Sequence, residues 1–384
     1  MINRTAAARL LRLAKTFRSV AVTGPRQSGK TTLCRTLFPQ KPYVSLENPD
    51  ILEFATADPR GFLVQYKNGA ILDEVQRAPL LFSYLQQVLD ETKKKGLFIL
   101  TGSNNFLLQQ NITQTLSGRV AYLQLLPLSL QELKEDNKIK ATYNWHILNG
   151  GYPEVLAKKI NPSDWYAGYI NTYVERDVRQ LKNISNLSLF IKLLRLCAGR
   201  TGQILNLTSL ANDCGIDQKT VAAWLSTLQS SYIIYLLRPY HGNFNKRIIK
   251  SPKLYFFDTG VACSLLGISQ AAQITTHAAK GALFENMIVS ELLKERFNTG
   301  SADNLYYWRD KTGNEVDILI DKAGKLSVME LKAGETVSAD FFKGIDFFSS
   351  LNKHTVQKLL VYGGKQEQQR SNGTLVLPWN RLPG

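Results

Sequence analysis

The chain has few cysteines and histidines, and their positions exclude two common kinds of site. Its four cysteines stand at positions 34, 197, 214 and 263, so no two have Cys-x-x-Cys spacing, and no histidine cluster lies near them. A zinc site or a disulfide framework is therefore not expected. Unpaired cysteines suit a reducing compartment, and we expect a cytoplasmic protein.

Long apolar runs are also missing. No stretch of the 384 residues reaches the roughly 18 apolar residues of a membrane span. The segment Met1–Val20 is basic, but it lacks the uninterrupted apolar core of a secretory signal. Its alanines and leucines suit an amphipathic helix that leads into the first strand. We therefore expect no membrane partner.

Acidic residues are in deficit. The chain has 47 lysines and arginines against 31 aspartates and glutamates, a net charge of +16. Such an excess favours a polyanionic partner, of which DNA is the one we expect, or an acidic membrane surface. The simpler alternative is a soluble protein that happens to be basic. The length suggests two or three domains.

Strands and helices alternate in the first third of the chain. Apolar strands are expected at 18–23, 42–46, 69–75 and 97–103, with helical periodicity after the first and third. This alternation predicts a parallel sheet flanked by helices, and hence an α/β fold.

The turn after the first expected strand carries a phosphate-binding pattern. Gly24-Pro25-Arg26-Gln27-Ser28-Gly29-Lys30-Thr31 matches GxxxxGK[ST] between a strand and a helix. Its glycines let backbone amides point at phosphate oxygens, Lys30 can bridge the β- and γ-phosphates, and the Thr31 hydroxyl can ligate Mg²⁺. We therefore predict ATP and Mg²⁺ as cofactors, bound by Gly24, Pro25, Arg26, Gln27, Ser28, Gly29, Lys30, Thr31 and Thr32.

Two carboxylates end the strand at 69–75. Asp73 can join the magnesium shell, and Glu74 can act as the base toward an attacking water. Ser103 and Asn104, after the next strand, could sense the γ-phosphate or orient that water. A simple Ser/Asn turn explains them equally well.

Arg119 stands just before a further apolar strand. An arginine there could act catalytically as a finger on the nucleotide of a neighbouring subunit. A solvated arginine is the alternative.

These motifs occur together in one known family. The ordered set Gly24–Thr31, Asp73–Gln76, Thr101–Ser103, Ser117–Arg119 and Gly150–Glu154 resembles a family of prokaryotic AAA-type ATPases. Its members carry a C-terminal domain, called DUF4143, that is related to PD-(D/E)XK nucleases. The resemblance implies an AAA core, a small helical lid and ring-like homo-oligomers such as hexamers.

The middle of the chain is typical of a helix-turn-helix. Asn206–Gly215 and Asp217–Leu228 read as two short helices joined by a glycine turn, and Ser231–Pro239 and Lys253–Asp258 could pair as a wing. Under this interpretation, helix residues reach the major groove and loop residues grip phosphates. The groove set is Gln218, Lys219 and Thr220, and the phosphate set is Lys246, Arg247 and Lys250. The alternative is a helical bundle used for subunit contacts.

The C-terminal part carries a second acidic pattern. Asp317 lies on an expected strand, and Glu330 and Lys332 share one face of the adjoining strand of a hairpin. With Glu285 on a preceding helix, these carboxylates could form a second Mg²⁺ site beside Lys332. The pattern resembles the PD-(D/E)XK nuclease core. The alternative is a nuclease-like fold kept for binding or assembly.

We therefore predict a P-loop AAA-type parallel sheet with three further parts. Residues 1–125 are expected to form the ATPase core, 126–185 a helical lid, 186–260 a winged-helix-like module and 275–384 a nuclease-like domain. The leading function is an ATP-dependent DNA-binding ATPase that remodels or translocates on duplex or branched DNA. The alternatives are a nucleotide-gated, Mg²⁺-dependent nuclease and an ATP-switched assembly or regulatory protein without motor activity.

Overall fold

The computed structural model describes residues 2–103, 116–173, 184, 186–241, 250–352 and 355–382. It contains two compact units. The N-terminal unit comprises Met1–Lys138, Ser230–Tyr232 and Lys294–Ser301, and the C-terminal unit comprises Ile139–Gln229, Ile233–Leu293 and Ala302–Gly384. Among the described helices, none has the length and apolarity needed to cross a membrane.

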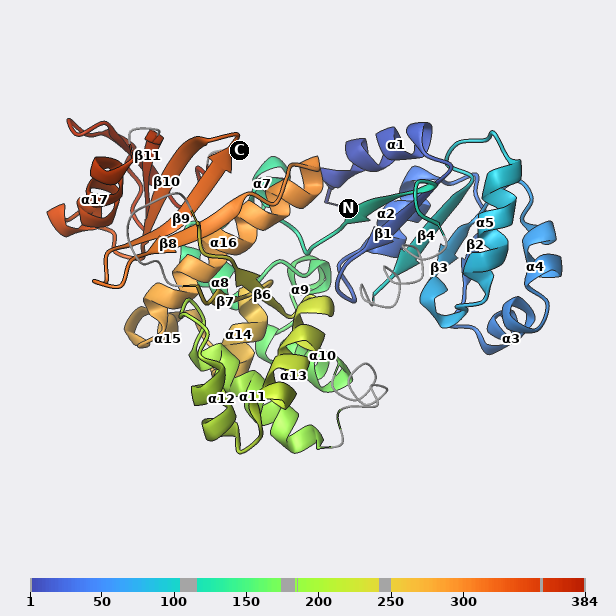
Figure 1. Cartoon of the computed structure of the whole chain (residues 1–384), viewed down its shortest axis with the longest axis horizontal. Coiled ribbons are helices and arrows are strands. Elements are labelled where there is room, and N and C mark those ends of the chain that lie inside the picture. Colours follow the sequence, from blue (N-terminus) through green and yellow to red (C-terminus); the bar gives the residue numbers. More distant parts are fainter. Residues whose placement is uncertain are drawn as a thin grey trace. The chain divides into compact units, whose positions relative to one another are not determined.

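The N-terminal unit is built on a five-stranded sheet in the order β2-β3-β4-β1-β5, with every neighbouring pair parallel (Figure 1). This confirms the predicted α/β fold. The central strand β1 pairs with both β4 and β5, and Ser19 lies opposite Phe98 and Val120. The strands are β1 (Ser19–Thr23), β2 (Tyr43–Ser45), β3 (Ile71–Asp73), β4 (Phe98–Gly102) and β5 (Val120–Gln124).

Helices cover both faces of this sheet, because alternate strand residues point to opposite sides. On one face Val20 and Val22 of β1 pack with Leu10 of α1 and Leu33 of α2. On the other face Ala21 packs within a larger cluster that includes side chains from α3, α4 and α5. The helices of this unit are α1 (Ala6–Thr16), α2 (Lys30–Leu37), α3 (Pro49–Ala57), α4 (Pro59–Gln65), the 3-10 turn η1 (Val75–Arg77), α5 (Leu81–Glu91) and α7 (Leu130–Glu135).

Two segments from later in the chain complete the N-terminal unit. Tyr232 shares a hydrogen bond of 2.9 Å with the Thr23 hydroxyl at the end of β1. Lys294, at 4% exposure, donates to the carbonyl of Leu128 at 3.0 Å. Arg9 of α1 donates to the carbonyl of Phe297 at 2.5 Å. The unit is therefore not a continuous stretch of sequence.

The helical part of the C-terminal unit contains the predicted helix-turn-helix segment. Asn206 caps α12 by accepting from the Ser209 amide, and Gly215 ends the helix in the left-handed conformation at φ 81°. Three helices precede an antiparallel strand pair, β6–β7, and Ile204 forms an additional bridge to Lys253. This order is the one expected of a winged helix, although that designation stays a prediction. The elements are α8 (Tyr143–Asn149), α9 (Pro153–Lys158), α10 (Pro162–Tyr173), α11 (Leu187–Gly199), α12 (Leu207–Cys214), α13 (Gln218–Ser230), β6 (Ile234–Leu237), β7 (Lys253–Phe256), α14 (Thr259–Leu265) and α15 (Ala271–Thr276).

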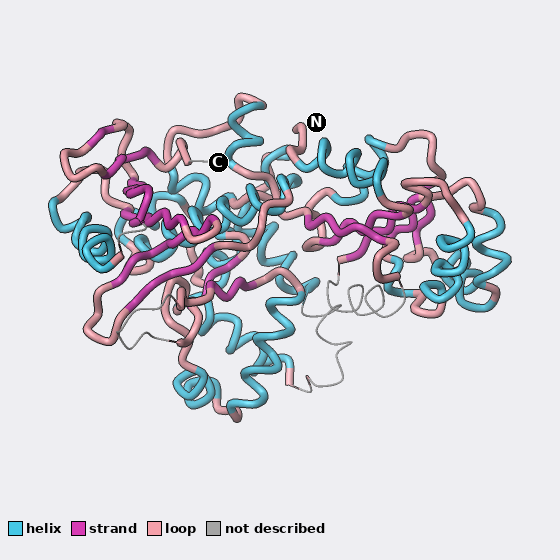
Figure 2. The backbone as a smooth tube through the Cα atoms, turned by 45° about the horizontal axis from the view of Figure 1, so that its top comes forward, coloured by secondary structure: helices cyan, strands magenta, loops and turns pink. Residues whose placement is uncertain are grey.

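The rest of this unit contains a six-stranded mixed sheet in the order β12-β13-β11-β10-β9-β8. Figure 2 draws the strands of the protein in magenta. The predicted hairpin is confirmed, since β9 and β10 are antiparallel with Lys322 opposite Lys325. Trp308, Val316, Val328, Ile345 and Phe348 build the buried core between this sheet and α17. The elements are α16 (Lys280–Thr299), β8 (Leu305–Arg309), β9 (Glu315–Lys322), β10 (Lys325–Lys332), the 3-10 turn η3 (Ala339–Phe342), α17 (Lys343–Leu351), β11 (Thr355–Tyr362), β12 (Gln368–Gln369) and β13 (Thr374–Pro378).

Candidate functional site

The predicted phosphate loop connects β1 to the first residue of α2. Gly29 precedes the helix in the left-handed conformation at φ 93°, which glycine adopts without a steric penalty. Gly24 has φ 150°, and a Cβ there would lie 2.1 Å from the carbonyl oxygen of Leu125. A side chain at position 24 would therefore push the loop away from β5. These two glycines fix a tight loop whose end is the N-terminus of a helix, a position that favours anions.

Lys30 is folded back onto this loop. Its side chain is 6% exposed, and Nζ donates to the carbonyls of Gly24 at 2.9 Å and Pro25 at 2.7 Å. Burial lowers the pKa of Lys30, and the nearby Glu74 and Asp73 carboxylates oppose that effect. The ammonium is thus held at the loop, where phosphate oxygens would replace the two carbonyls as its acceptors.

Asp73 ends β3 and collects three hydroxyl donors from neighbouring elements. Thr31 of α2 donates to its two carboxylate oxygens at 3.2 and 3.1 Å. Tyr43 of β2 donates to Oδ2 at 2.6 Å, and Thr101 of β4 donates to Oδ1. The side chains of Thr31 and Asp73 are therefore adjacent, as their predicted roles require.

Glu74 follows directly, in the left-handed conformation at φ 55°, which side chains other than glycine rarely adopt. Ser103 donates to its Oε2 at 3.0 Å, and Gln76 donates to the same oxygen at 2.5 Å. Because of this turn, the side chains of Glu74 and Asp73 point in different directions. Ser103, a candidate from the sequence, contacts the predicted base and not only its own turn.

The donors at this site suit magnesium. Thr31 and Asp73 supply oxygen ligands, which Mg²⁺ prefers. Ser28 Oγ lies buried in the loop without a hydrogen-bond partner among the described residues. Buried polar atoms normally have partners, so the loop has capacity for a polar ligand.

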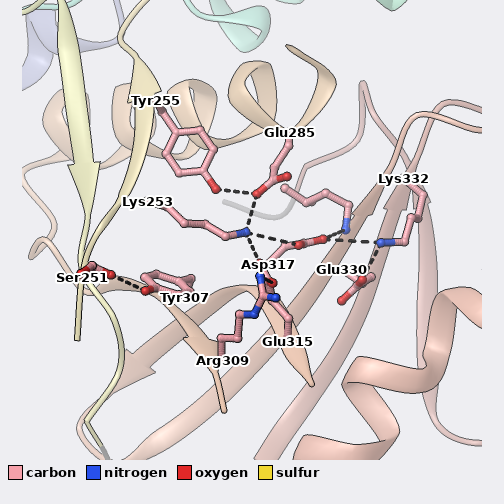
Figure 3. Close-up of polar contacts among 11 residues, drawn as sticks. Ser251, Lys253, Tyr255, Glu285, Tyr307, Arg309, Glu315, Asp317, Glu330 and Lys332 are labelled. Atoms are coloured by element: carbon pink, nitrogen blue, oxygen red, sulfur yellow. Dashed lines mark hydrogen bonds and ion pairs between the residues drawn. The ribbon is translucent and has the colours of Figure 1, made fainter. Parts of the chain in front are cut away.

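The C-terminal unit contains a cluster of four carboxylates, Glu285, Glu315, Asp317 and Glu330, which we call the acidic cluster (Figure 3). Glu285 comes from α16, Glu315 and Asp317 from β9, and Glu330 from β10. Lys253 of β7 lies among them, with Nζ 3.0 Å from Glu285 Oε1 and 3.7 Å from Asp317 Oδ1, and it also pairs with Glu315. Lys332 pairs with Glu330 at 2.5 Å and with Asp317 at 3.9 Å.

Burial and mutual repulsion govern protonation in this cluster. Burial raises the pKa of Glu330, the charge of Asp317 adds to the rise, and Lys332 opposes it. Burial also raises the pKa of Glu285, against the effect of Lys253. For Lys253 burial acts to lower the pKa, but the surrounding carboxylates outweigh burial and raise it well above its ordinary value. The carboxylates thus favour the charged form of Lys253.

The second Mg²⁺ site predicted at Glu285, Asp317 and Glu330 stays a prediction, and lysines of the chain pair with its carboxylates. They do converge, together with Lys332. In the described part of the chain, however, no group of three or more His, Cys, Asp or Glu side chains is arranged to hold a metal ion. The Lys253 ammonium stands between Glu285 and Asp317. Two lysines of the same chain, Lys253 and Lys332, pair with carboxylates of the acidic cluster.

Three family models match successive parts of the chain. Residues 16–134 match an AAA domain, 140–272 match a domain of unknown function (DUF8612), and 280–382 match a domain of unknown function (DUF4143). An uncharacterised protein of Mycobacterium tuberculosis is 31% identical over 340 residues, which are 88% of this chain and 75% of that protein. The chain belongs to the AAA-type ATPase family that carries a C-terminal DUF4143 domain.

Other similar proteins are more distant. An uncharacterised protein of Haemophilus influenzae is 21% identical over 301 residues, covering 73% of this chain and 68% of its own. Among solved structures, a Walker-type ATPase of Pyrococcus abyssi is similar over 69% of this chain and 96% of its own, with 16% identity and a TM-score of 0.47.

In the AAA domain, Arg119 lies at the edge of the sheet opposite the phosphate loop. It precedes β5, whose residue Gln124 lies beside Thr23 at the loop end of β1. Its Nε and Nη2 donate to the two carboxylate oxygens of Asp90 at 2.5 and 2.9 Å. Arg119 is thus far from the nucleotide site of its own chain, and its role toward a neighbour stays a prediction.

The predicted DNA-contacting residues are only partly described. Gln218 and Lys219 are exposed at the start of α13, and Gln218 donates to the Thr208 hydroxyl at 3.0 Å. The Thr220 hydroxyl donates to Asp217 at 2.5 Å, so it is engaged in capping the helix. Lys250 is exposed. Lys246, Arg247 and the catalytic candidate Asn104 lie outside the described residues.

Sequence reasoning missed four residues that shape these sites. Tyr43 and Thr101 hold Asp73, Glu315 is one of the carboxylates of the acidic cluster, and Lys253 pairs with it. Lys253 and Glu315 carried a weak signal in the sequence. Lys253 is a lysine within an apolar strand, and Glu315 stands two residues before Asp317, on the same face of the strand. Tyr43 carried no local signal, whereas Thr101 stood in the polar motif Thr101–Ser103 without being assigned to Asp73.

Proposed function

We propose that this protein binds ATP with Mg²⁺ at the phosphate loop and hydrolyses it. One observation carries the proposal. Lys30 and Thr31, at the start of α2, lie beside Asp73, which ends β3. Glu74 follows Asp73 in the chain and accepts a hydrogen bond from Ser103. Phosphate binding, metal binding and water activation need these residue types in one place.

Each side chain has a distinct role under this proposal. The backbone amides of the loop and Lys30 bind the β- and γ-phosphates. Thr31 and Asp73 hold Mg²⁺, which when bound would neutralise phosphate charge and polarise the phosphoryl oxygens. Glu74 takes a proton from the attacking water or orients it, while Ser103 and Gln76 hold its Oε2 and leave its other oxygen available.

We infer further that DNA is the partner on which ATP turnover acts, in a ring-like assembly. The support is the net charge of +16 and the exposed Gln218, Lys219 and Lys250 around the α12–α13 turn and the β6–β7 pair. Remodelling of, or translocation along, duplex or branched DNA would couple the two activities.

The test of ATP hydrolysis compares three single substitutions. Glu74→Gln should bind a fluorescent ATP analogue as the wild type does and lose about 10²- to 10⁴-fold in turnover, because only the base is lost. Lys30→Ala should lose nucleotide binding. Glu53→Gln, an exposed position on α3, is the matched control and should hydrolyse normally. Wild-type turnover by Glu74→Gln would refute the assignment of the base.

DNA dependence is tested separately on the wild-type protein. Turnover should rise when duplex or branched DNA is added and should show no such response in Glu74→Gln. Turnover that ignores DNA would favour the alternative of an ATP-switched regulatory or assembly protein, and would leave the ATPase assignment standing.

A further inference from the structure

Lys253 lies at the centre of the acidic cluster. A metal ion bound by these carboxylates would have to occupy the same position. Its side chain is 3% exposed. Nζ faces Glu285 Oε1 at 3.0 Å, Asp317 Oδ1 at 3.7 Å and a carboxylate oxygen of Glu315 (Figure 3). An ammonium has three N–H donors, and three carboxylates from two elements surround it.

The backbone around Lys253 is tied on both sides. Lys253 pairs with Leu237 of β6 and bridges Ile204. Leu254 donates to Gln203 at 3.0 Å and accepts from Gly202 at 2.7 Å. Moving the ammonium out of the cluster by shifting β7 would break several of these bonds together. The position of the Lys253 backbone is therefore set by the strand pairing, and the ion pairs hold its ammonium within the cluster.

A divalent metal would compete for the same space and the same charge. Mg²⁺ requires oxygen ligands at about 2.0–2.1 Å in near-octahedral geometry, and a cation shared by Glu285 and Asp317 would have to lie where Nζ lies. Two cations in one buried site repel strongly. The remaining carboxylates already have cations of the chain, since Glu330 pairs with Lys332 at 2.5 Å and Glu315 with Arg309 at 3.0 Å.

We propose that Lys253 is the resident cation of the acidic cluster, so that the DUF4143 domain holds its carboxylates without a divalent metal. The nuclease-like order of acidic residues then serves to fix β7 against α16 and β9, and no metal-dependent cleavage takes place there. This inference does not depend on the ATPase function, because it concerns different residues and a different ion.

The first test asks whether the cluster binds metal in the full chain. Mn²⁺ binding is measured by electron paramagnetic resonance without nucleotide, in an Asp73→Asn background that removes the metal ligand of the phosphate loop. Adding Asp317→Asn should change neither the number of bound Mn²⁺ ions nor their affinity. The proposal would be overturned if a bound Mn²⁺ ion disappeared in the Asp317→Asn variant. It would also be overturned if the wild type nicked plasmid DNA and the Asp317→Asn variant did not.

The second test removes the ammonium. Lys253→Met keeps an unbranched side chain without the ammonium and leaves buried carboxylates unpaired, so Tm should fall by an amount on the order of 10 °C. In the Asp73→Asn background, Mn²⁺ should now bind and recover part of the loss, and adding Asp317→Asn should abolish that recovery. Lys250→Met, an exposed neighbour, is the matched control and should keep the wild-type Tm. An unchanged Tm in Lys253→Met would contradict the role assigned to Lys253, and if that variant does not fold, the first test decides.

Discussion

The phenolic hydroxyl of Tyr43 donates a hydrogen bond of 2.6 Å to Oδ2 of Asp73 across the β2–β3 pair. Burial and this hydrogen bond raise the pKa of Tyr43 to about 12, so the hydroxyl remains a donor at neutral pH. Asp73 is the predicted magnesium ligand. Residues that orient a metal ligand from outside tune its affinity for the metal.

Tyr43→Phe should therefore raise the Mg²⁺ concentration that gives half-maximal ATP hydrolysis, by about tenfold. Tyr84→Phe, at a similarly exposed tyrosine on α5, should leave that concentration unchanged. The measurement is the initial rate of phosphate release at saturating ATP over a series of Mg²⁺ concentrations. A lower Mg²⁺ requirement in Tyr43→Phe would show that the hydroxyl competes with the metal instead of supporting its ligand.

Arg119→Ala should bind ATP normally and hydrolyse it poorly if a neighbouring subunit uses this arginine. Mixing Arg119→Ala with Glu74→Gln protein should restore some turnover, because a mixed interface can pair an intact Glu74 with an intact Arg119. Asp90→Ala is the control, because it removes the ion-pair partner of Arg119 and leaves Arg119 itself in place. Equal losses of turnover in both variants, without complementation on mixing, would assign Arg119 to that ion pair.

Replacing Lys246, Arg247 and Lys250 together by alanine should weaken DNA binding for all sequences. If each contacts one phosphate, the slope of log affinity against log salt should become shallower by about three units. A triple alanine variant of Lys93, Lys94 and Lys95 removes three charges elsewhere and should keep the wild-type slope. An unchanged slope in the first variant would remove this loop from the DNA-binding surface.

Glu330 should make the C-terminal unit less stable as pH rises. Its pKa in the folded state is raised above the ordinary value of 4.5, chiefly by burial. Between those two values the folded state binds more protons than the unfolded state, so stability is present at low pH and is lost as pH rises, by up to about 1.4 kcal/mol per pH unit. Glu330→Gln should flatten this slope in urea unfolding followed by tryptophan fluorescence, and the exposed Glu335→Gln should not. A steeper slope in Glu330→Gln would contradict the direction of the shift.

The parts of the fold that involve residues close together in the sequence could be predicted from the sequence. The phosphate loop needs only a strand, eight residues of fixed pattern and a helix, and the structure has β1 and α2 on either side of it. The β9–β10 hairpin follows from alternating apolar residues on both sides of a short turn, and the structure places Lys322 opposite Lys325 at that turn.

The contacts that depend on sheet order were not predictable in the same way. Tyr43 and Thr101 contact Asp73 because β2 and β4 lie on either side of β3 in the sheet. The order of strands in the chain does not show this, since β1 and β2 are consecutive in sequence but are not neighbours in the sheet. Lys253 reaches Asp317 from a strand 64 positions earlier, by way of a bridge to Ile204 and a pairing with β6. An acidic pattern read along one hairpin shows which carboxylates converge, and does not show which cation another element brings to them.

The discontinuity of the N-terminal unit has a consequence for how the protein is made. Thr23, at the mouth of the phosphate loop, has its partner at Tyr232, and Arg9 and Leu128 have theirs at Phe297 and Lys294. A ribosome delivers the chain from its N-terminus, so the Tyr232 contact forms only after residue 232 has emerged, and the other two contacts only after residues 294 and 297 have emerged. A nascent or truncated chain that stops near residue 138 would have every side chain predicted to bind the nucleotide and still lack the last supports of the unit. We therefore expect translation of the late segments, and not of the phosphate loop itself, to set the moment at which the protein becomes competent for ATP.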